Sequence, residues 1–423
     1  MFNNKLEALN CYLVGGAVRD KLLGHKVYDH DYVVVGATIE QMLALGFTQV
    51  GKDFPVFLHP TTKEEYALAR TERKQGHGYT GFICDASIAV TLEEDLLRRD
   101  LTINAMAMPF NDSAESTTII DPYNGQVDLK NRVLRHVSLA FIEDPLRVLR
   151  VARFTARYHH YGFTIAEETL QLMTEISNSG ELATLSGERI WQEMQRSLTE
   201  SHPEIFFEVL RKCGALAKIW AELNSLWGIP NPEKWHPEIC SGLHTMMVLQ
   251  QSVKLSTKTS VRFAALCHDL GKSLTLKENW PRHQGHEKSG LALVEKICEQ
   301  LKVPKDHKIL ARKVCEFHLH CHKAFDLKAS TIVKLFNSLD VWRKPEEFSD
   351  FLTACTADFR GRLHNEEKPY PQVDYLKSAF QAALTITAKE FIEQGIKGPD
   401  IKEAINKKRI EVIEVIKKSA KIS

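Results

Sequence analysis

The stretch Tyr12–Gly36 constrains the fold of this chain more than any other part of the sequence. An apolar, β-prone run ends at Gly15-Gly16, a helical turn follows, and a second strand-like run begins at Asp31. Two adjacent glycines let the backbone approach an anion closely, and Arg19 supplies a charged donor nearby. The order strand, glycine turn, helix, strand therefore predicts a site for a triphosphate.

Two carboxylates stand where the second strand begins. Asp29 and Asp31 are two residues apart, so in extended backbone both project from one face and can bind hard cations through oxygen. A glycine pair alone is usually a turn, and a D-x-D alone is usually a solvated strand end. Together, in this order and within one short unit, they predict a meeting point of phosphates and a metal pair.

The pattern G-G-A-V-R-D followed by D-x-D resembles motif A of the class II nucleotidyltransferases of the polymerase-β superfamily. This family includes the tRNA CCA-adding enzymes and the bacterial poly(A) polymerases. The resemblance covers most of the chain and is nearest to bacterial CCA-adding enzymes that carry a C-terminal HD phosphohydrolase domain. It implies an α+β fold: a polymerase-β-type head, a small sheet with helices, followed by an all-α neck, body, HD domain and tail.

The order of strand-like and helical runs agrees with this fold. Short β-like runs alternate with short helical segments up to about Phe110, which favours a small sheet with helices on one side. The implied domain ranges are 1–140 for the head, 141–237 for the neck and body, 238–342 for the HD domain and 343–423 for the tail.

The resemblance implies roles for the motif A residues. Asp29 and Asp31 would hold Mg²⁺ for nucleotidyl transfer, and Glu65 falls at the third acidic position of the catalytic site. Gly16 and Arg19 would bind the triphosphate of ATP or CTP. By composition alone, Glu65 is more often a surface residue than a catalytic one.

The segment Leu96–Ala107 resembles motif B, R-R-D, which handles the sugar and phosphates of the nucleotide. A guanidinium such as that of Arg99 can bind phosphate oxygens in bidentate fashion, and the Asp100 carboxylate can accept from a ribose 2′-OH. Asn104 belongs to the same predicted nucleotide site. The alternative is a charge cluster at a helix N-terminus.

The segment Glu143–Arg153 resembles motif D, E-D-x-x-R, in which side chains replace a nucleic-acid template. Cytosine and adenine both present an amino donor beside an unprotonated ring nitrogen. Asp144 and Arg147, one helical turn apart, can match that pattern, and a mismatched base would strand buried polar groups at a cost of roughly 1–3 kcal/mol each. Arg150 and Arg153 correspond to further nucleotide-contacting arginines. The alternative is a salt-bridged amphipathic helix.

Three further segments match the family. Arg189 and Glu193, in R-I-x-x-E, resemble motif E and are expected to brace the neck helices. The turn Asp121–Gly125 matches the hinge after the head, and the glycine-rich Gly76–Gly81 is expected to be a loop over the site. The connector Gly228–Trp235 indicates a domain boundary.

A second site is predicted in the C-terminal half. The run FAALCHDLGK buries an adjacent His-Asp pair, which is costly unless the pair is hydrogen-bonded or binds a metal. This pattern resembles the HD phosphohydrolases, in which a bound metal, here a transition metal such as Ni²⁺, activates water for attack on phosphorus. His286 lies nearby, and His320 and His322 are possible substitutes because Leu319 follows His318 where relatives have Asp. The predicted ligands are His244, His268, Asp269, His318 and Asp358.

Composition limits the remaining possibilities. The formal net charge is +1, so attraction to nucleic acid must come from local basic faces such as the lysines of the segment 401–422, which more often form only a solvated face. The nine cysteines form no C-x-x-C pair and are expected to be reduced. Without a signal sequence or a long apolar run, we predict a cytoplasmic protein that does not bind membranes, as a monomer or homodimer.

Three functions remain open at this stage. The first is template-independent addition of C, C and A to the 3′ end of tRNA, with an accompanying phosphohydrolase activity on 2′,3′-cyclic phosphates, 2′-nucleotides and other phosphate esters. The second is a poly(A) polymerase, whose motifs are much the same. The third is an HD phosphohydrolase whose head serves only to bind RNA.

Overall fold

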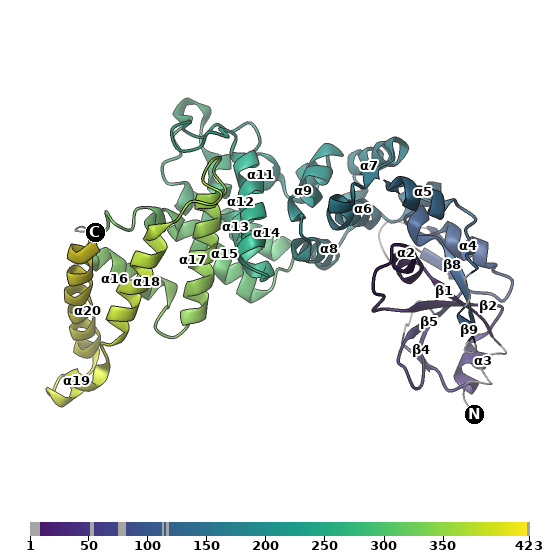
Figure 1. Ribbon diagram of the computed structural model, residues 1–423, viewed down its shortest axis with the longest axis horizontal. Helices are drawn as coiled ribbons and strands as arrows, with labels where there is room; N and C mark the ends of the chain where they lie inside the picture. The colour runs from purple at the N-terminus through teal and green to yellow at the C-terminus, as the bar shows by residue number, and fades with distance from the viewer. Residues whose placement is uncertain (1–8, 51–54, 75–81, 112–113, 116–117, 421–423) are drawn as a thin grey trace. The chain divides into compact units, whose positions relative to one another are not determined.

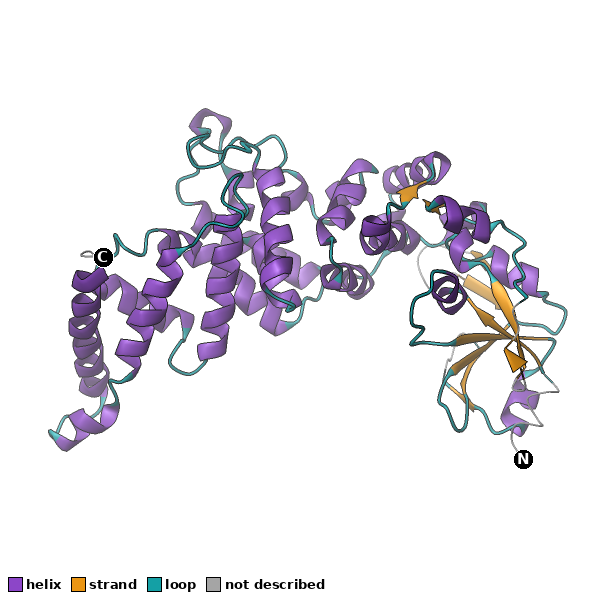
Figure 2. Ribbon diagram, in the orientation of Figure 1, coloured by secondary structure: helices purple, strands orange, loops and turns teal. Residues whose placement is uncertain are grey.

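The computed structural model describes residues 9–50, 55–74, 82–111, 114–115 and 118–420 (Figure 1). The chain forms two compact units, Met1–Met194 with Ile205–Ile219 and Gln195–Glu204 with Trp220–Ser423. Within the described ranges, strands occur only in the first unit, and the second is helical (Figure 2). The predicted α+β class, with a sheet-containing head and an all-α remainder, is confirmed.

The first unit is built on a seven-stranded sheet of order β3-β4-β5-β2-β1-β8-β9. β1 pairs antiparallel with both β2 and β8, whereas β2 pairs parallel with β5. A separate two-stranded ribbon joins β6 to β7, and β10 pairs with β11. The strands are β1 (Asn10–Val14), β2 (Asp31–Val35), β3 (Thr48–Gln49), β4 (Val56–Leu58), β5 (Glu65–Leu68), β6 (Thr71–Lys74), β7 (Phe82–Asp85), β8 (Ala107–Asn111), β9 (Ala114–Glu115), β10 (Val133–Leu134) and β11 (Thr164–Ile165).

Both faces of this sheet are buried. Tyr32 and Val34 of β2 pack in one apolar cluster with Met42 of α3 (Ile39–Ala44). The intervening Val33 packs in a second cluster with Leu96 of α4 (Leu92–Leu97), because successive side chains of a strand point to opposite faces. The expectation of helices on one side only was therefore wrong: an α3 cluster and an α4 cluster cover opposite faces.

Helices complete the first unit. α2 directly follows the glycine turn, and the turn that begins at Asp121 precedes α5, whose first backbone N–H groups donate to the Asp121 carboxylate at 2.7 and 2.9 Å. α6 is buried along most of its length. The helices are α2 (Gly16–Leu22), α5 (Gly125–Asn131), α6 (Leu146–Tyr158), α7 (Glu167–Ser179), α8 (Gly187–Thr199), α9 (Pro203–Lys212) and α10 (Ala215–Ile219).

The second unit packs its long helices around α13, which contacts α12, α15 and α17. α13 is buried almost throughout, and its second half, from Phe263, is apolar, as expected for a helix at the centre of the unit. The helices are α11 (Ala221–Asn224), α12 (Ser241–Leu255), α13 (Thr259–Cys267), α14 (His286–Gln300), α15 (Lys305–His322), α16 (Ala329–Leu339), α17 (Pro345–Arg360), α18 (Pro371–Leu384), α19 (Ala388–Glu393) and α20 (Pro399–Ala420), with a 3-10 helix η6 (Leu270–Leu274) after α13.

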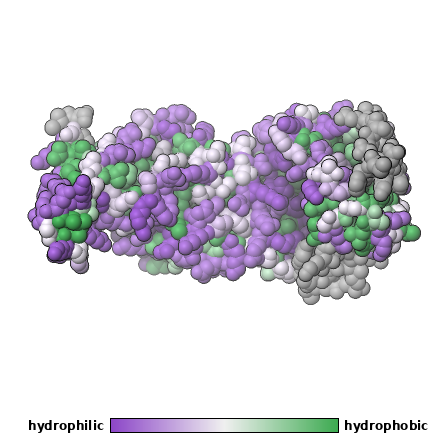
Figure 3. Space-filling view, turned by 90° about the horizontal axis from the view of Figure 1, so that it is seen from below, coloured by the Kyte–Doolittle hydropathy of each residue, from purple (hydrophilic) through white to green (hydrophobic). Residues whose placement is uncertain are grey.

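Two further predictions concern the absence of membrane-spanning segments and a loop over the site. Hydrophilic residues predominate on the face drawn in Figure 3. Across the described ranges, every helix is too short or too polar to cross a bilayer. The predicted loop over the site, Gly76–Gly81, lies outside the described residues.

Candidate active sites

The predicted catalytic carboxylates meet at one end of the sheet. Asp31 opens β2 opposite Val14, the last residue of β1, so the glycine turn that follows β1 lies at the same end. In the parallel ladder Asp31 is also the partner of Glu65, and Asp29 directly precedes the strand. All three carboxylate residues are exposed. The ladder therefore places Asp31 and Glu65 side by side, a pairing that sequence spacing could not predict.

The charge balance at this end favours cation binding. Although Asp31 is exposed as a residue, partial burial of its carboxyl group raises its pKa; Arg99 opposes this and the neighbouring Asp29 adds to it. Two carboxylates whose charges disfavour each other gain from a shared divalent cation. The donor set, carboxylate oxygens alone, is the one that Mg²⁺ prefers, so the residues fit that ion.

The glycine turn holds an arginine against its backbone. Gly15 has φ +67°, and a Cβ there would lie 2.9 Å from Nη1 of Arg99, so a larger residue would displace the guanidinium. Arg99 Nη2 also pairs with Asp95 at 3.1 Å, while its Nε is buried without a hydrogen-bond partner. A guanidinium held beside the turn with spare donor capacity suits an incoming phosphate.

A buried polar network connects the turn to α6. Arg19 donates from Nη1 to Asn104 Oδ1 at 2.5 Å, and Asn104 donates to Asp100 at 3.0 Å. Asp100 in turn accepts from Arg150 Nε at 2.7 Å. Burial alone would raise the pKa of Asp100, but the charge of Arg150 outweighs it and the pKa lies well below its usual value. Four predicted nucleotide-site residues thus form one network in the protein without nucleotide.

The predicted base-reading pair spans the start of α6. Asp144 is not in the helix: its backbone is extended, and its carboxylate accepts from the Leu146 N–H at the start of α6. Arg189 Nη2 contacts both Asp144 oxygens, at 2.9 and 3.1 Å. Arg147 lies on α6 and donates to the backbone carbonyls of Ala140 and Arg98. The Arg147 N–H donates to the Asp144 backbone carbonyl at 3.0 Å, so the two residues are one turn apart as expected, with Asp144 just ahead of α6.

The motif E residues both reach toward α6. Arg189 binds Asp144 as described, and Glu193 accepts from Arg153 Nε at 2.6 Å and lies 3.9 Å from Arg150 Nη1. Both residues therefore form ion pairs with residues outside α8, as the expected bracing requires. α8 fixes the residues that flank α6.

The predicted HD residues converge from four helical segments of the second unit. His244 lies on α12, His268 and Asp269 directly follow α13, His318 lies on α15, and Asp358 lies on α17. Their ligand atoms form two groups, His244 with His268 and Asp358, and Asp269 with His286 and His318, each within 4.8 Å. At 0–2% exposure, all five predicted residues are buried.

The histidine tautomers suit metal binding. Nδ1 of His268, His286 and His318 faces backbone carbonyls at 2.7–3.1 Å and donates there, so Nε2 of each ring is left to face the cluster. Nε2 of His286 and Nε2 of His318 lie 3.4 Å apart, and two lone pairs so placed need a proton or a cation between them. Nε2 of His268 lies 3.1 Å from Asp269 Oδ2, and the neighbouring carboxylates outweigh burial and raise the pKa of that imidazole. These residues fit a transition metal.

The cluster carboxylates remain ionised. Burial alone would raise the pKa of Asp358, but His322, His268 and Arg362 lower it well below its usual value. Burial lowers the pKa of His318, so that imidazole is neutral and available as a ligand. Anionic oxygens and neutral imidazoles are the protonation states that metal binding requires.

Sequence patterns did not identify Tyr370, Glu238 or His236 as members of the HD cluster, and they offered His322 only as a possible substitute ligand. His322 Nε2 lies 2.5 Å from Asp358 Oδ2, and Tyr370 contacts the other ring nitrogen at 2.6 Å. On the opposite side, Glu238 Oε1 lies 3.0 Å from Nδ1 of His244 and 2.8 Å from His236. Of the two suggested substitutes, His322 belongs to the cluster, whereas His320 packs edge-on against Phe317.

The connector before α12 is part of this site. Asn231 accepts from Lys272 at 2.9 Å, and Lys272 pairs with Asp269 at 2.5 Å. Pro230 and Cys240 form a β-bridge that closes the connector into a loop. The Pro and Trp residues that indicated a boundary therefore also mark a loop folded onto the HD cluster.

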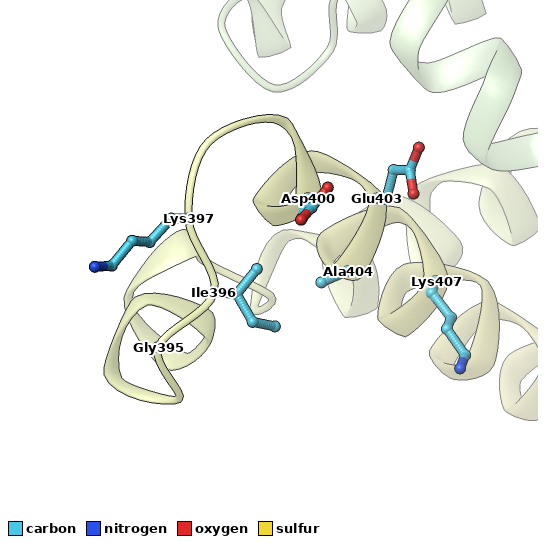
Figure 4. A pocket seen from close by; sticks show the side chains of 7 residues that line it. All are labelled: Gly395, Ile396, Lys397, Asp400, Glu403, Ala404 and Lys407. Atoms are coloured by element: carbon cyan, nitrogen blue, oxygen red, sulfur yellow. The ribbon is translucent and has the colours of Figure 1, made fainter.

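A surface hollow lies far along the chain from both clusters. It has a volume of about 670 Å³, and Figure 4 shows its lining of Gly395, Ile396, Lys397, Asp400, Glu403, Ala404 and Lys407. These residues come from α20 and the turn before it, and the predicted site residues are absent from the lining. We assign it no role in the chemistry.

Comparison with known proteins agrees with a sheet-containing first unit and a helical second unit. The chain matches the poly A polymerase head domain over residues 11–135, a "probable RNA and SrmB-binding site of polymerase A" over 162–226 and the HD domain over 242–347. It is similar in fold to a CCA-adding enzyme solved with ATP (20% identity, TM-score 0.66, 97% of this chain and 88% of that one) and to one from Thermotoga maritima solved with tRNA (19%, 0.63, 99% and 94%).

The fold and the two clusters define a class II nucleotidyltransferase with an appended HD domain. Closer relatives are the multifunctional CCA proteins of Pseudoalteromonas atlantica, 62% identical over 96% of this chain and 99% of that protein, and of Vibrio parahaemolyticus, 57% identical over the same shares. The chain belongs to the family of multifunctional CCA proteins. The resemblance found in its motifs is confirmed.

Proposed function

We propose that the first unit adds C, C and A to the 3′ end of tRNA from CTP and ATP, and that the HD cluster hydrolyses phosphate esters. The observation that carries the first part is the convergence of Asp31, Glu65 and the Gly15 turn at one end of the sheet. In a member of this family, that convergence provides metal ligands and a phosphate seat side by side.

The carboxylates of Asp29 and Asp31 would hold Mg²⁺, which supplies charge neutralisation at the attacking hydroxyl and the leaving pyrophosphate. Glu65 extends the acidic cluster from the neighbouring strand. Arg99 and Arg19 hold the triphosphate next to the turn, where the absence of a Cβ at Gly16 keeps the approach open. Asp100 and Asn104 fix Arg19 and Arg150 and contact the sugar.

The base is read by Asp144 and Arg147. The Asp144 carboxylate is an acceptor and the Arg147 guanidinium a donor, which is the pair of functions that reading an amino group beside a ring nitrogen requires. Arg189 orients the Asp144 carboxylate, and the two carbonyls orient Arg147. Asp144 accepts from the amino group of C or A, and Arg147 donates to the adjacent ring nitrogen. Arg150 and Arg153 lie further along α6.

The HD cluster acts on 2′,3′-cyclic phosphates, 2′-nucleotides and simple phosphate monoesters with a transition metal such as Ni²⁺, which supplies an activated water when bound. His244, His268, Asp269, His318 and Asp358 hold the metal. We further propose a cytoplasmic enzyme that works as a monomer or homodimer and does not bind membranes. The domain ranges 1–140, 141–237, 238–342 and 343–423 are part of this proposal.

The decisive experiment supplies all four labelled nucleoside triphosphates to a tRNA lacking its terminus and sequences the product. Addition of C, C and A, and then a stop, is the expected result. A long A tail with ATP alone would identify a poly(A) polymerase instead. Hydrolysis without any incorporation would leave the head as an RNA-binding module only.

The base-reading role has its own test. Asp144→Ala and Arg147→Ala are each expected to weaken the preference for C and A over U and G. Unchanged selection in both variants would contradict it, and the Glu188→Gln variant, with an exposed acid on α8, serves as the control.

A further inference from the structure

Arg362 lies at the outer side of the HD cluster. It follows α17, four residues after Asp358, and its Nη2 is 3.5 Å from Asp358 Oδ1 and 3.2 Å from His322 Nε2. Its side chain is 16% exposed, against 3% for Asp358. Arg362 and His322 are the most solvent-accessible side chains around this carboxylate, so they mark the side from which a substrate reaches it.

The guanidinium is held in place by its neighbours. A Cβ at Gly361 would lie 2.5 Å from Val248 Cγ2, so the chain passes tightly against α12 at this point. On the other side, the Leu363 N–H donates to Glu238 Oε2 at 3.3 Å. The backbone on both sides of Arg362 is therefore anchored, and the side chain is pre-positioned.

The charges around Asp358 conflict once a metal binds. Asp358 Oδ1 faces Nε2 of His244 at 3.1 Å and Nε2 of His268 at 3.8 Å, so this oxygen belongs to a candidate metal group. A divalent cation taking that oxygen would stand close to the Arg362 guanidinium. The single negative charge of Asp358 lies between them but does not balance a divalent cation and a guanidinium together, so the excess positive charge favours a further anion.

We propose that Arg362 binds the phosphate group of the substrate at the metal-loaded HD cluster, an assignment that rests on the proposed hydrolase function. The guanidinium fork matches two oxygens of a phosphate, and Nε of Arg362 is buried without a hydrogen-bond partner and so has a donor to give. Lys272, the other nearby cation, is occupied by Asp269 and Asn231.

The test separates phosphate binding from metal binding and from turnover. Wild type, Arg362→Gln, Arg362→Lys and the control Lys368→Gln, whose exposed lysine lies in the same loop, are loaded with Ni²⁺ and titrated with inorganic phosphate by calorimetry. Arg362→Gln is expected to raise the phosphate Kd about 10- to 100-fold, and Arg362→Lys to raise it less. The Ni²⁺ affinity should stay the same or increase, because a neighbouring cation is removed.

A merely structural Arg362 gives a different result. Loss of Ni²⁺ affinity together with phosphate affinity, or an unchanged phosphate Kd in Arg362→Gln, would overturn the proposal, as would absence of phosphate binding to loaded wild type. For 2′,3′-cyclic AMP, the variant should raise KM more than it lowers kcat. If loaded wild type binds phosphate through Arg362 but hydrolyses nothing, the proposed hydrolase function fails while the binding assignment stands.

Discussion

The candidate metal ligands of the two units differ in how far they are exposed to solvent. In the first unit, Asp29, Asp31 and Glu65 are exposed at the end of a sheet. In the second unit, the exposed fractions of His244 and Asp358 are 0% and 2%, and each carboxylate is already in contact with imidazoles or a cation.

This difference predicts different costs of mutation. An exposed carboxylate is hydrated without its metal, so its removal changes the chemistry and leaves the fold alone. A buried carboxylate has already lost its hydration, so its removal leaves buried partners uncompensated. In the HD cluster, stability and function should therefore be lost together, and in the head they should separate.

The largest effect is expected for Asp358→Ala, which leaves His322 and Arg362 without their shared anion. Hydrolysis should be lost, and the free energy of unfolding of the second unit should fall by about 3–5 kcal/mol. Denaturant unfolding followed by circular dichroism measures this, with the exposed Asp374→Asn as control. An unchanged unfolding midpoint would show that the cluster does not depend on its internal charges.

In the head, Asp31→Asn should lower CCA addition by about 10³-fold, a size typical of losing one electrostatic group at a transition state. The unfolding midpoint should not change, because this side chain is exposed. Incorporation of labelled CTP into truncated tRNA gives the activity, and the exposed Glu93→Gln is the matched variant. Full activity would refute the metal role, and a large drop in stability would break the contrast between the clusters.

The sequence predicted this contrast only in part. The D-x-D pattern and the HD pair could be found because their members are adjacent or two residues apart in the chain. Pairing between Asp31 and Glu65 depends on strand register, and contact of Glu238 with His244 depends on a loop that folds back, so neither follows from spacing. The helix start at Leu146 does not follow from the sequence either, because the acids and Pro145 ahead of it fit a helical first turn equally well.

A smaller effect is expected for Glu238→Gln. Burial alone would raise the pKa of Glu238, but hydrogen bonds from His236 and His244 lower it, so an anion faces Nδ1 of His244. That anion keeps the proton on Nδ1 and leaves Nε2 facing Asp358, so its neutralisation should weaken Ni²⁺ binding about 10- to 100-fold. Calorimetry with Ni²⁺ measures this, and unchanged affinity relative to the exposed Glu367→Gln would contradict it.

The last test, in which the smallest effect is the change between two pH values, asks whether the head also has an ionised carboxylate in its interior. The folded-state pKa of Asp100 lies below its unfolded value because Arg150 outweighs burial. The stabilisation from this pair should be complete above the ordinary aspartate pKa of about 4 and disappear as the pH falls through the lower folded value.

At pH 7, Asp100→Asn should lower the free energy of unfolding by about 1.5–3 kcal/mol relative to wild type, the range for hydrogen bonds to charged groups. At pH 3 the difference should narrow, because the unfolded wild type then binds a proton that the folded protein resists. Urea unfolding at both pH values measures the difference. If the difference in free energy of unfolding between wild type and Asp100→Asn were the same at both pH values, Asp100 would stabilise the head without its charge. Dependence of stability on buried charge would then be a property of the HD cluster and not of the head.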